Sequence, residues 1–144
     1  MSKWDDRFLT MAITVSTWSK DPKRRVGAVI ADADHRVVSV GYNGFPRGVD
    51  DSPALLEDSQ QKLLRTLHAE ANALLFAARP VANCTTYVTY PPCSQCAAML
   101  IQAGVARVVT LRPGDAKEAS SKWAVSWQAA EQMMREAGVD LELR

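Results

Sequence analysis

The chain has 144 residues, which suits one compact domain and leaves little room for two. Its 17 Lys and Arg residues almost balance its 16 Asp and Glu residues, so the net charge of +1 argues against nucleic acid or an anionic membrane as a partner. No apolar run approaches the roughly 20 residues that span a bilayer, and residues 1–6 contain two acids where a signal peptide would be basic and then apolar. We therefore expect one cytoplasmic domain over residues 1–144.

The first half of the chain shows a helical pattern and then strand patterns. Apolar residues from Trp4 to Trp18 recur at steps of three and four, which predicts an amphipathic helix. Two short runs rich in β-branched residues lie on either side of a polar turn and predict a hairpin. In chain order we expect a helix over residues 4–18, strands over 26–31 and 37–42, mostly loop from residue 43 to about 59, and one long helix up to Ala78.

The second half alternates strands with helices. Gly104 and Gly138 each follow a helical pattern and precede an apolar run, which is the expected position of a left-handed helix cap. Such alternation favours parallel strands joined by right-handed crossovers, so the pattern predicts an α/β fold with a mixed sheet covered by helices on both faces. The expected elements are strands over 85–90, 107–111 and 139–143 and helices over 94–103 and 120–137.

Two cysteines and one histidine form the most specific pattern in the chain. Cys93 and Cys96 stand three residues apart at a predicted helix start, where both sulfurs can face one point. The helix dipole and free N–H groups there favour thiolates, the form of cysteine that binds metal. Together with His68 they make three protein ligands, and zinc takes four, which leaves one position for water. The pattern indicates a catalytic zinc site rather than a structural one.

The remaining cysteine and histidine are poor candidates for a fourth ligand. Cys84 is separated from Cys93 by a predicted strand, and a strand of about six residues is about 20 Å long. We expect Cys84 to be a small buried apolar residue and His35 to be an exposed turn residue. The sequence therefore predicts one zinc ion per chain.

Glu70 is the candidate for proton transfer. It stands two residues after His68, so on a helix the two side chains diverge by about 200° and are poorly placed to share one ion. A carboxylate beside the metal can instead take a proton from the attacking water and deliver it to the substrate. By itself Glu70 would be interpreted as a surface residue of a helix. Its occurrence together with the three candidate ligands is what makes proton transfer by Glu70 a specific hypothesis.

Four blocks of the sequence support a family resemblance: residues 19–22 with 26–30, residues 41–48, residues 68–73 and residues 91–97. The pattern H-x-E followed by P-C-x-x-C is typical of zinc-dependent nucleobase deaminases in general. On all four blocks together, and above all on Gly-Tyr-Asn-Gly within residues 41–48, the sequence resembles the deoxycytidylate (dCMP) deaminase family of the cytidine deaminase superfamily.

The resemblance implies a three-layer α/β/α sandwich around a five-stranded mixed sheet, and hydrolysis of dCMP to dUMP and ammonia. It implies that His68, Cys93 and Cys96 bind the zinc and that Glu70 shuttles the proton. The substrate-binding residues that it implies are Asn43, through the sugar, and Ala69, Pro91 and Pro92, through the pyrimidine edge.

The resemblance also implies assembly and regulation. Members of the family are commonly hexameric, and many are activated by dCTP with Mg²⁺ and inhibited by dTTP. We therefore expect a homo-oligomer, with a hexamer favoured. The residues that the resemblance connects with effector binding are Gly41, Tyr42, Asn43 and Gly44.

A basic cluster marks a candidate phosphate site. Lys20, Lys23, Arg24 and Arg25 lie between the first helix and the first strand of an otherwise nearly neutral chain, where the family usually has at most one base. A solvated basic turn would explain this cluster as well as a binding role does. Our hypothesis is that at least one of these residues faces the substrate phosphate and that others face an effector or a neighbouring subunit.

Three alternatives remain open on the sequence alone. Another deaminase of the superfamily would act on deoxycytidine, dCTP or tRNA adenosine, although a tRNA enzyme would need a basic surface. A thiol–disulfide oxidoreductase also places C-x-x-C at a strand-to-helix junction, but it gives no role to His68 and Glu70. A zinc-stabilised binding module would require a fourth protein ligand.

Overall fold

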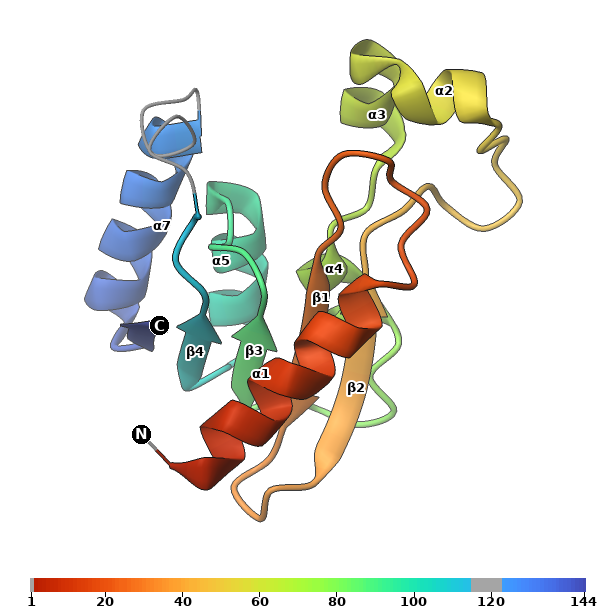
Figure 1. Ribbon diagram of the computed structural model, residues 1–144. Helices are drawn as coiled ribbons and strands as arrows, with labels where there is room; N and C mark the ends of the chain where they lie inside the picture. Colours follow the sequence, from red (N-terminus) through yellow and green to blue (C-terminus); the bar gives the residue numbers. More distant parts are fainter. Residues whose placement is uncertain (1, 115–122) are drawn as a thin grey trace.

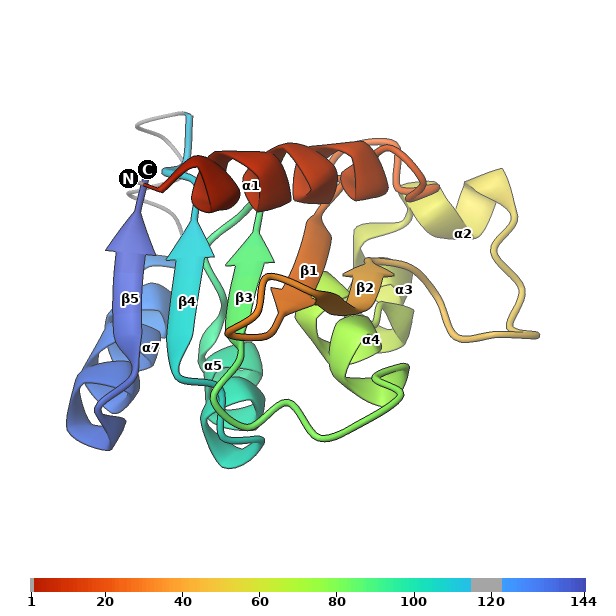
Figure 2. The same cartoon turned by 90° about the horizontal axis from the view of Figure 1, so that it is seen from below.

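The computed structural model describes residues 2–114 and 123–144. The helices are α1 (Lys3–Ser16), α2 (Pro53–Glu57), α3 (Ser59–Arg65), α4 (Ala69–Leu75), α5 (Ser94–Gln102) and α7 (Trp123–Ala137). The strands are β1 (Gly27–Ala31), β2 (Val37–Tyr42), β3 (Thr85–Val88), β4 (Arg107–Thr110) and β5 (Asp140–Leu143). Helix α1 covers one face of the sheet, and α4, α5 and α7 cover the other (Figures 1 and 2). The predicted three-layer α/β/α sandwich is confirmed.

The sheet is mixed, and this arrangement determines where the loops gather. The strand order is β2-β1-β3-β4-β5, with β1 antiparallel to both neighbours and β3, β4 and β5 parallel. Gly27, at the start of β1, pairs with Tyr42 at the end of β2, and Ala28 pairs with Val88 at the end of β3. The segments before β1, after β2 and after β3 therefore meet at one end of the sheet.

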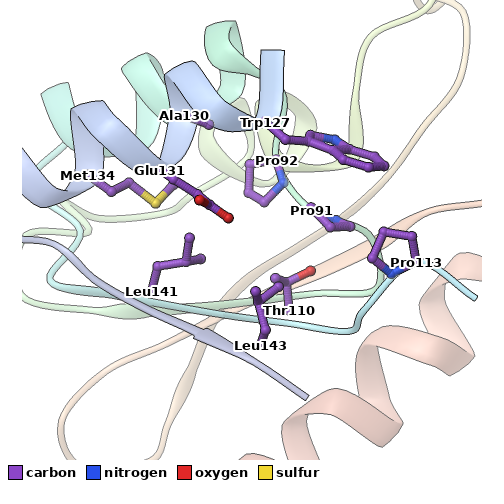
Figure 3. A pocket seen from close by; sticks show the side chains of 10 residues that line it. All are labelled: Pro91, Pro92, Thr110, Pro113, Trp127, Ala130, Glu131, Met134, Leu141 and Leu143. Carbon is purple, nitrogen blue, oxygen red and sulfur yellow. The ribbon is translucent and has the colours of Figure 1, made fainter. Parts of the chain in front are cut away.

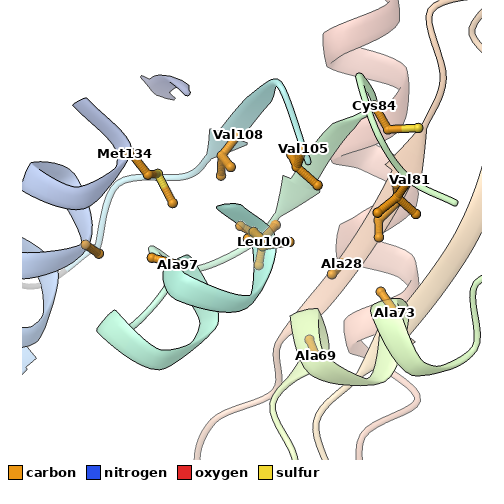
Figure 4. Packing of buried hydrophobic residues seen from close by; sticks show 13 residues of the cluster. Ala28, Ala69, Ala73, Val81, Cys84, Ala97, Leu100, Val105, Val108 and Met134 are labelled. Atoms are coloured by element: carbon orange, nitrogen blue, oxygen red, sulfur yellow. The ribbon is translucent and has the colours of Figure 1, made fainter. Parts of the chain in front are cut away.

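The larger apolar core lies between the sheet and α4, α5 and α7. Small side chains, Ala28 on β1 and Ala69 and Ala73 on α4, meet where α4 lies against the sheet, whereas the larger Leu100 and Met134 fill the space beneath α5 and α7 (Figure 4). All five residues are at most 1% exposed. Because small residues allow close approach, α4 is held tightly against β1 and β2.

Gly41 allows α4 to approach the sheet on β2. A Cβ added at Gly41 would lie 2.4 Å from the carbonyl oxygen of Ala69 and 2.4 Å from the amide nitrogen of Ala73. Both are backbone atoms, which cannot turn aside as a flexible side chain can. The start of α4 is therefore placed by a direct backbone contact with β2.

The expectation of one long helix up to Ala78 is wrong, whereas residues 43–59 are mostly loop as expected, apart from the short helix α2. In place of the long helix the chain forms α3 and α4. Asp58 ends α2 and caps α3 by accepting a hydrogen bond from the backbone N–H of Gln61. Leu67 then leaves the helical path and pairs with Gly44 through two backbone hydrogen bonds of 2.8 and 3.1 Å. A helical period cannot reveal such a break, because the pairing partner lies more than 20 residues away in the sequence.

Other predicted boundaries agree with the structure within a few residues. The predicted left-handed glycines are confirmed, since φ is 85° at Gly104 and 75° at Gly138. Strand β3 ends at Val88 rather than at residue 90, and residues 120–122 of the predicted last helix lie outside the described residues. Within the described part of the chain, no helix combines the length and the apolar character needed to cross a membrane.

Candidate metal and catalytic site

Two helix starts converge at the loop-rich end of the sheet. His68 is the N-cap residue of α4 and Cys93 is the N-cap residue of α5, and both have extended backbones. The Cys93 sulfur accepts a hydrogen bond from the backbone N–H of Cys96 at 3.4 Å, as an N-cap side chain normally does. The sequence placed His68 near the start or in the first half of a long helix, and the break at Leu67 places it at the start of α4.

The three predicted ligands lie together. The Nδ1 atom of His68 is 3.5 Å from the Cys93 sulfur and 3.3 Å from the Cys96 sulfur, and all three ligand atoms lie within 4.8 Å of one another. An ion bound at about 2.3 Å from sulfur and about 2.0 Å from nitrogen with tetrahedral angles separates the two atoms by about 3.5 Å. The donor set therefore fits zinc, with Nδ1 of His68 as the ligand atom. Among the described residues, no fourth His, Cys, Asp or Glu joins this group.

The two sulfurs share one proton, and Cys93 carries the negative charge. The pKa of Cys93 is lowered to about 4, first because the Cys96 thiol donates a hydrogen bond to its sulfur and further because His68 and the N–H of Cys96 stabilise the thiolate. The pKa of Cys96 is raised by the adjacent Cys93 sulfur and by burial. A stable thiolate at a helix start is the form that binds a metal ion.

Glu70 lies in the first turn of α4, beside the ligands, and is 4% exposed. Burial raises the pKa of its carboxyl group to about 7, which outweighs the opposing effect of the nearby His68 imidazole. Cys93 adds to the rise as a second negative group. Such a carboxyl group can both accept and release a proton near neutral pH.

A pocket of about 400 Å³ lies next to His68, Glu70 and Cys93. His68, Ala69, Glu70 and Cys93 are among its lining residues, as are the cationic side chains of Lys23, Arg24 and Lys62 and the rings of Tyr90 and Trp127. This volume falls within the range of small-molecule sites. The lining therefore combines a buried acid, two of the predicted metal ligands and a positively charged region in a single pocket.

The predicted substrate-binding residues lie in or next to the pocket. Ala69, Pro91 and Asn43 line it, whereas Pro92 lines a neighbouring cavity. The Asn43 amide is engaged within the protein, since its oxygen accepts from the N–H of Val26 at 2.8 Å and its nitrogen donates to the Arg24 carbonyl at 2.9 Å. Asn43 thus holds the segment that carries Arg24.

The four residues of the basic cluster separate into two pairs. Lys23 and Arg24 line the pocket. Lys20 is exposed and its ammonium group binds Asp51 at 2.8 Å, and the Arg25 guanidinium donates to the Asp21 carbonyl at 3.1 Å. Lys20 and Arg25 are not among the pocket-lining residues.

The four predicted effector residues have the following places. Gly41 lies under α4, as described above. The Tyr42 ring is partly exposed and meets Trp18 edge-to-face at 6.1 Å, and its carbonyl accepts from the Asn72 side chain at 2.7 Å. Asn43 lines the pocket, and Gly44 pairs with Leu67. Effector binding by these residues stays a prediction.

The sequence analysis missed several residues at this pocket, among them Lys62 and Trp127. Lys62 lies on α3 and was assigned to a long helix without a function, and Trp127 lies on α7, far along the chain from every motif. The Arg24 guanidinium stacks over the Tyr90 ring at 4.3 Å, and that ring packs against Trp127 at 5.5 Å. Neither residue stands in a recognisable motif, so only the folded chain reveals them.

A second, smaller cavity of about 90 Å³ lies next to the pocket, on the other side of Pro91 and Trp127. Pro91 and Trp127 line both spaces, and Figure 3 shows Glu131 and Thr110 on opposite sides of the smaller one. Its lining is mainly apolar, and its volume accommodates only a few water-sized molecules.

One His, two Cys and a nearby Glu that is not a ligand form the pattern of zinc-dependent nucleobase deaminases. The family model "Cytidine and deoxycytidylate deaminase zinc-binding region" matches residues 2–112, which is more than half of the chain. The chain therefore belongs to the cytidine and deoxycytidylate deaminase family. The match ends before α7.

Individual relatives agree with this assignment. A protein from Aliivibrio fischeri described as "Uncharacterized deaminase in luxG 3'region" is 45% identical over 98% of this chain and 93% of its own length. A "Probable deoxycytidylate deaminase" from Caenorhabditis elegans is 47% identical over 78% of this chain and 59% of its own length. The crystal structure of dCMP deaminase from the cyanophage S-TIM5 in complex with dCMP and dUMP has a TM-score of 0.76 at 21% identity, covering 100% of this chain and 99% of that one. At this identity the last likeness concerns the fold.

Proposed function

We propose that the chain hydrolyses dCMP to dUMP and ammonia. The observation on which the proposal depends is the buried Glu70 carboxyl group beside the His68, Cys93 and Cys96 ligands, in a pocket that is also lined by cations. The name of a relative supports the substrate, since the Caenorhabditis elegans protein, at 47% identity, is called a probable deoxycytidylate deaminase.

The reaction adds water at C4 of the pyrimidine and expels the amino group as ammonia. Zinc, when bound by these three residues, supplies the Lewis acid that activates the attacking water. Glu70 accepts a proton from that water and donates it to N3, which makes C4 electrophilic. Glu70 then takes the second water proton and delivers it to the departing amino group. Over one cycle Glu70 returns to its starting state, and dCMP and water become dUMP and ammonia.

The proposed substrate is tested by ammonia release from a panel of cytosine compounds. Zinc-loaded enzyme is assayed with dCMP, deoxycytidine, dCTP and CMP, and kcat/KM is compared across the panel. We expect dCMP to be the preferred substrate because the cations lining the pocket suit a phosphate group. Equal kcat/KM for dCMP and deoxycytidine would refute recognition of the phosphate, and release of ammonia only from other members of the panel would replace dCMP as the substrate.

Regulation, assembly and location stay predictions from the sequence. Activation by dCTP with Mg²⁺ and inhibition by dTTP are tested by adding each nucleotide to the dCMP assay. The predicted hexamer is tested by measuring the molar mass of the protein by light scattering as it elutes from a size-exclusion column, at several concentrations. A cytoplasmic location is tested by fractionation of cells that express the protein.

The oxidoreductase alternative is disfavoured by the surroundings of the two cysteines. His68 lies within 3.5 Å of both sulfurs, and a dithiol redox centre gives neither this imidazole nor the buried Glu70 a function. A binding module stabilised by zinc would need a fourth protein ligand, and the described residues contain none. Metal analysis and thiol titration of the native protein provide the test.

A further inference from the structure

Asp21 is a buried acid in the loop before β1. It is 6% exposed, and its Oδ1 atom accepts hydrogen bonds from the backbone N–H groups of Lys23 and Arg24 at 2.8 and 2.9 Å. Burial would raise its pKa, but these two N–H groups and the Lys62 ammonium outweigh burial and lower it. Asp21 is therefore a charged anchor that fixes the backbone of the two residues whose side chains line the pocket.

Lys62 reaches the same carboxylate oxygen from a different part of the chain. It lies on α3, 41 residues later, and its Nζ atom is 2.9 Å from Oδ1 of Asp21. Its side chain is only 19% exposed, and it lines the pocket that contains Glu70. An ammonium group has three N–H donors, of which this ion pair uses one.

Burial distinguishes Lys62 from Lys20, one of the four basic residues of the predicted phosphate cluster. The side chain of Lys20 is 70% exposed and is bound to Asp51, outside the pocket lining. An exposed ion pair of this kind is worth little, because water and salt screen it. An ammonium group held in place and largely removed from water binds an anion more strongly, because the local dielectric is lower and less side-chain entropy is lost on binding.

We propose that Lys62, positioned by Asp21, binds the 5′-phosphate of the substrate and thereby selects a nucleoside monophosphate over the nucleoside. The inference rests on the proposed function and identifies the residue responsible for its selectivity. Lys23, on the loop that Asp21 anchors, lines the same pocket and adds positive charge near this group. The role of Asp21 is to hold Lys62 and this loop in place rather than to touch the substrate.

The test compares two substrates in two variants. For Lys62→Met, kcat/KM for dCMP should fall by about 10- to 150-fold, the loss expected for a hydrogen bond to a charged group, and kcat/KM for deoxycytidine by less than about threefold. Lys62→Arg should recover much of the loss, because a guanidinium also binds phosphate. Lys3→Met is the matched control, since Lys3 is an exposed lysine on α1, outside the pocket lining.

A binding measurement separates recognition from turnover. Trp123 and Trp127 line the pocket, so quenching of tryptophan fluorescence reports the Kd of the products dUMP and deoxyuridine. Lys62→Met should raise the Kd of dUMP by the same factor as it lowers kcat/KM for dCMP. The Kd of deoxyuridine should stay within threefold of the wild-type value, and the zinc content should equal that of wild type. Asp21→Asn should raise KM for dCMP more than it lowers kcat.

The outcomes distinguish the inference from the function on which it rests. If wild-type enzyme treats dCMP and deoxycytidine alike, both the proposed substrate and the role of Lys62 are wrong. If wild type prefers dCMP and Lys62→Met keeps the same preference, only the role of Lys62 is overturned. An equal loss for dCMP and deoxycytidine would show that Lys62 supports the fold and does not bind phosphate.

Discussion

Two carboxyl groups, Glu70 and Asp5, are almost equally buried, at 4% and 3% exposure, yet their surroundings act on them in opposite directions. The pKa of Glu70 is raised to about 7 by burial. The pKa of Asp5 is lowered to about 2, chiefly by its hydrogen bonds with the Arg107 guanidinium, and a further hydrogen bond from Tyr87 adds to this effect. Burial alone therefore does not decide how a carboxyl group behaves.

The difference lies in the partners. Both Asp5 oxygens accept from Arg107 at 2.9 Å, Tyr87 donates a third hydrogen bond at 2.9 Å, and Arg107 also binds Glu142 on β5. This network joins α1 to β3, β4 and β5. Glu70 instead lies in the candidate active-site pocket, beside the predicted metal ligands. A carboxylate whose charge is held by a guanidinium stabilises the fold, whereas one on which burial is the dominant influence is suited to proton transfer near neutral pH.

Removing a metal ligand should have the largest effect. Cys96→Ala should reduce bound zinc from one ion per chain to near zero and abolish ammonia release, because two protein ligands hold zinc poorly. Cys84→Ala is the matched control: Cys84 is buried in the apolar core, and its replacement should keep zinc and cost about 1 kcal/mol of stability. Mass spectrometry measures the zinc content of both variants. A zinc-replete Cys96→Ala variant would show that the assigned ligand set is wrong.

Glu70→Gln should lower kcat by at least about a thousandfold with zinc retained, because an amide cannot shuttle a proton. Its thermal midpoint should not fall, since the substitution removes a charge that burial disfavours. Glu131→Gln, on α7 beside the smaller cavity, serves as the control and should change kcat little. Substantial turnover in a zinc-replete Glu70→Gln variant would contradict the role assigned to Glu70.

Asp5→Asn should lower stability and leave kcat nearly unchanged, the reverse of what we expect for Glu70→Gln. It leaves Arg107 without its main partner, so the free energy of unfolding should fall by about 3 kcal/mol, while kcat of the folded enzyme stays within twofold. The exposed neighbour Asp6 provides the control, and Asp6→Asn should change stability by less than about 0.5 kcal/mol. Urea unfolding measures both. A large loss of kcat in folded Asp5→Asn would remove the distinction between the two carboxyl groups.

Gly41→Ala tests whether the sheet positions α4, the helix that carries Glu70. The added Cβ would lie 2.4 Å from two backbone atoms of α4, so α4 must shift, and we expect a loss of about 2–3 kcal/mol of stability together with weaker zinc binding. Gly44→Ala is a closely matched control, because a Cβ there meets nothing within 4 Å. Thermal unfolding and competition with a zinc chelator report the two effects. Equal behaviour of the two variants would argue against this placement of α4.

The smallest predicted effect is the acid dependence of stability. Asp5 has a folded pKa of about 2 against an ordinary value of 3.8, so its contribution is fully present above about pH 4 and is lost as the pH falls through about 2. The difference amounts to about 2 kcal/mol at neutral pH. Urea titrations between pH 5 and 2 should show a smaller decline for Asp5→Asn than for wild type. Parallel declines would mean that Asp5 is not the responsible group.

Local patterns were sufficient to predict much of the fold and the grouping of His68, Cys93 and Cys96. The alternation of strands and helices and the glycine caps at Gly104 and Gly138 were correct, because such signals depend on residues only a few positions apart. The Cys93–Cys96 spacing likewise predicted two sulfurs facing one point, and in the structure both lie within 3.5 Å of His68.

Only the tertiary structure decided which groups meet across long stretches of chain. The predicted long helix breaks because Leu67 pairs with Gly44, and this break places His68 at a helix start. Lys62 reaches Asp21 from 41 residues away, and Arg107 reaches Asp5 from 102. These contacts leave no local pattern in the sequence, because the strength of a hydrogen bond or an ion pair depends on how close its groups lie in space. That closeness is set by the packing of helices and loops around the whole sheet.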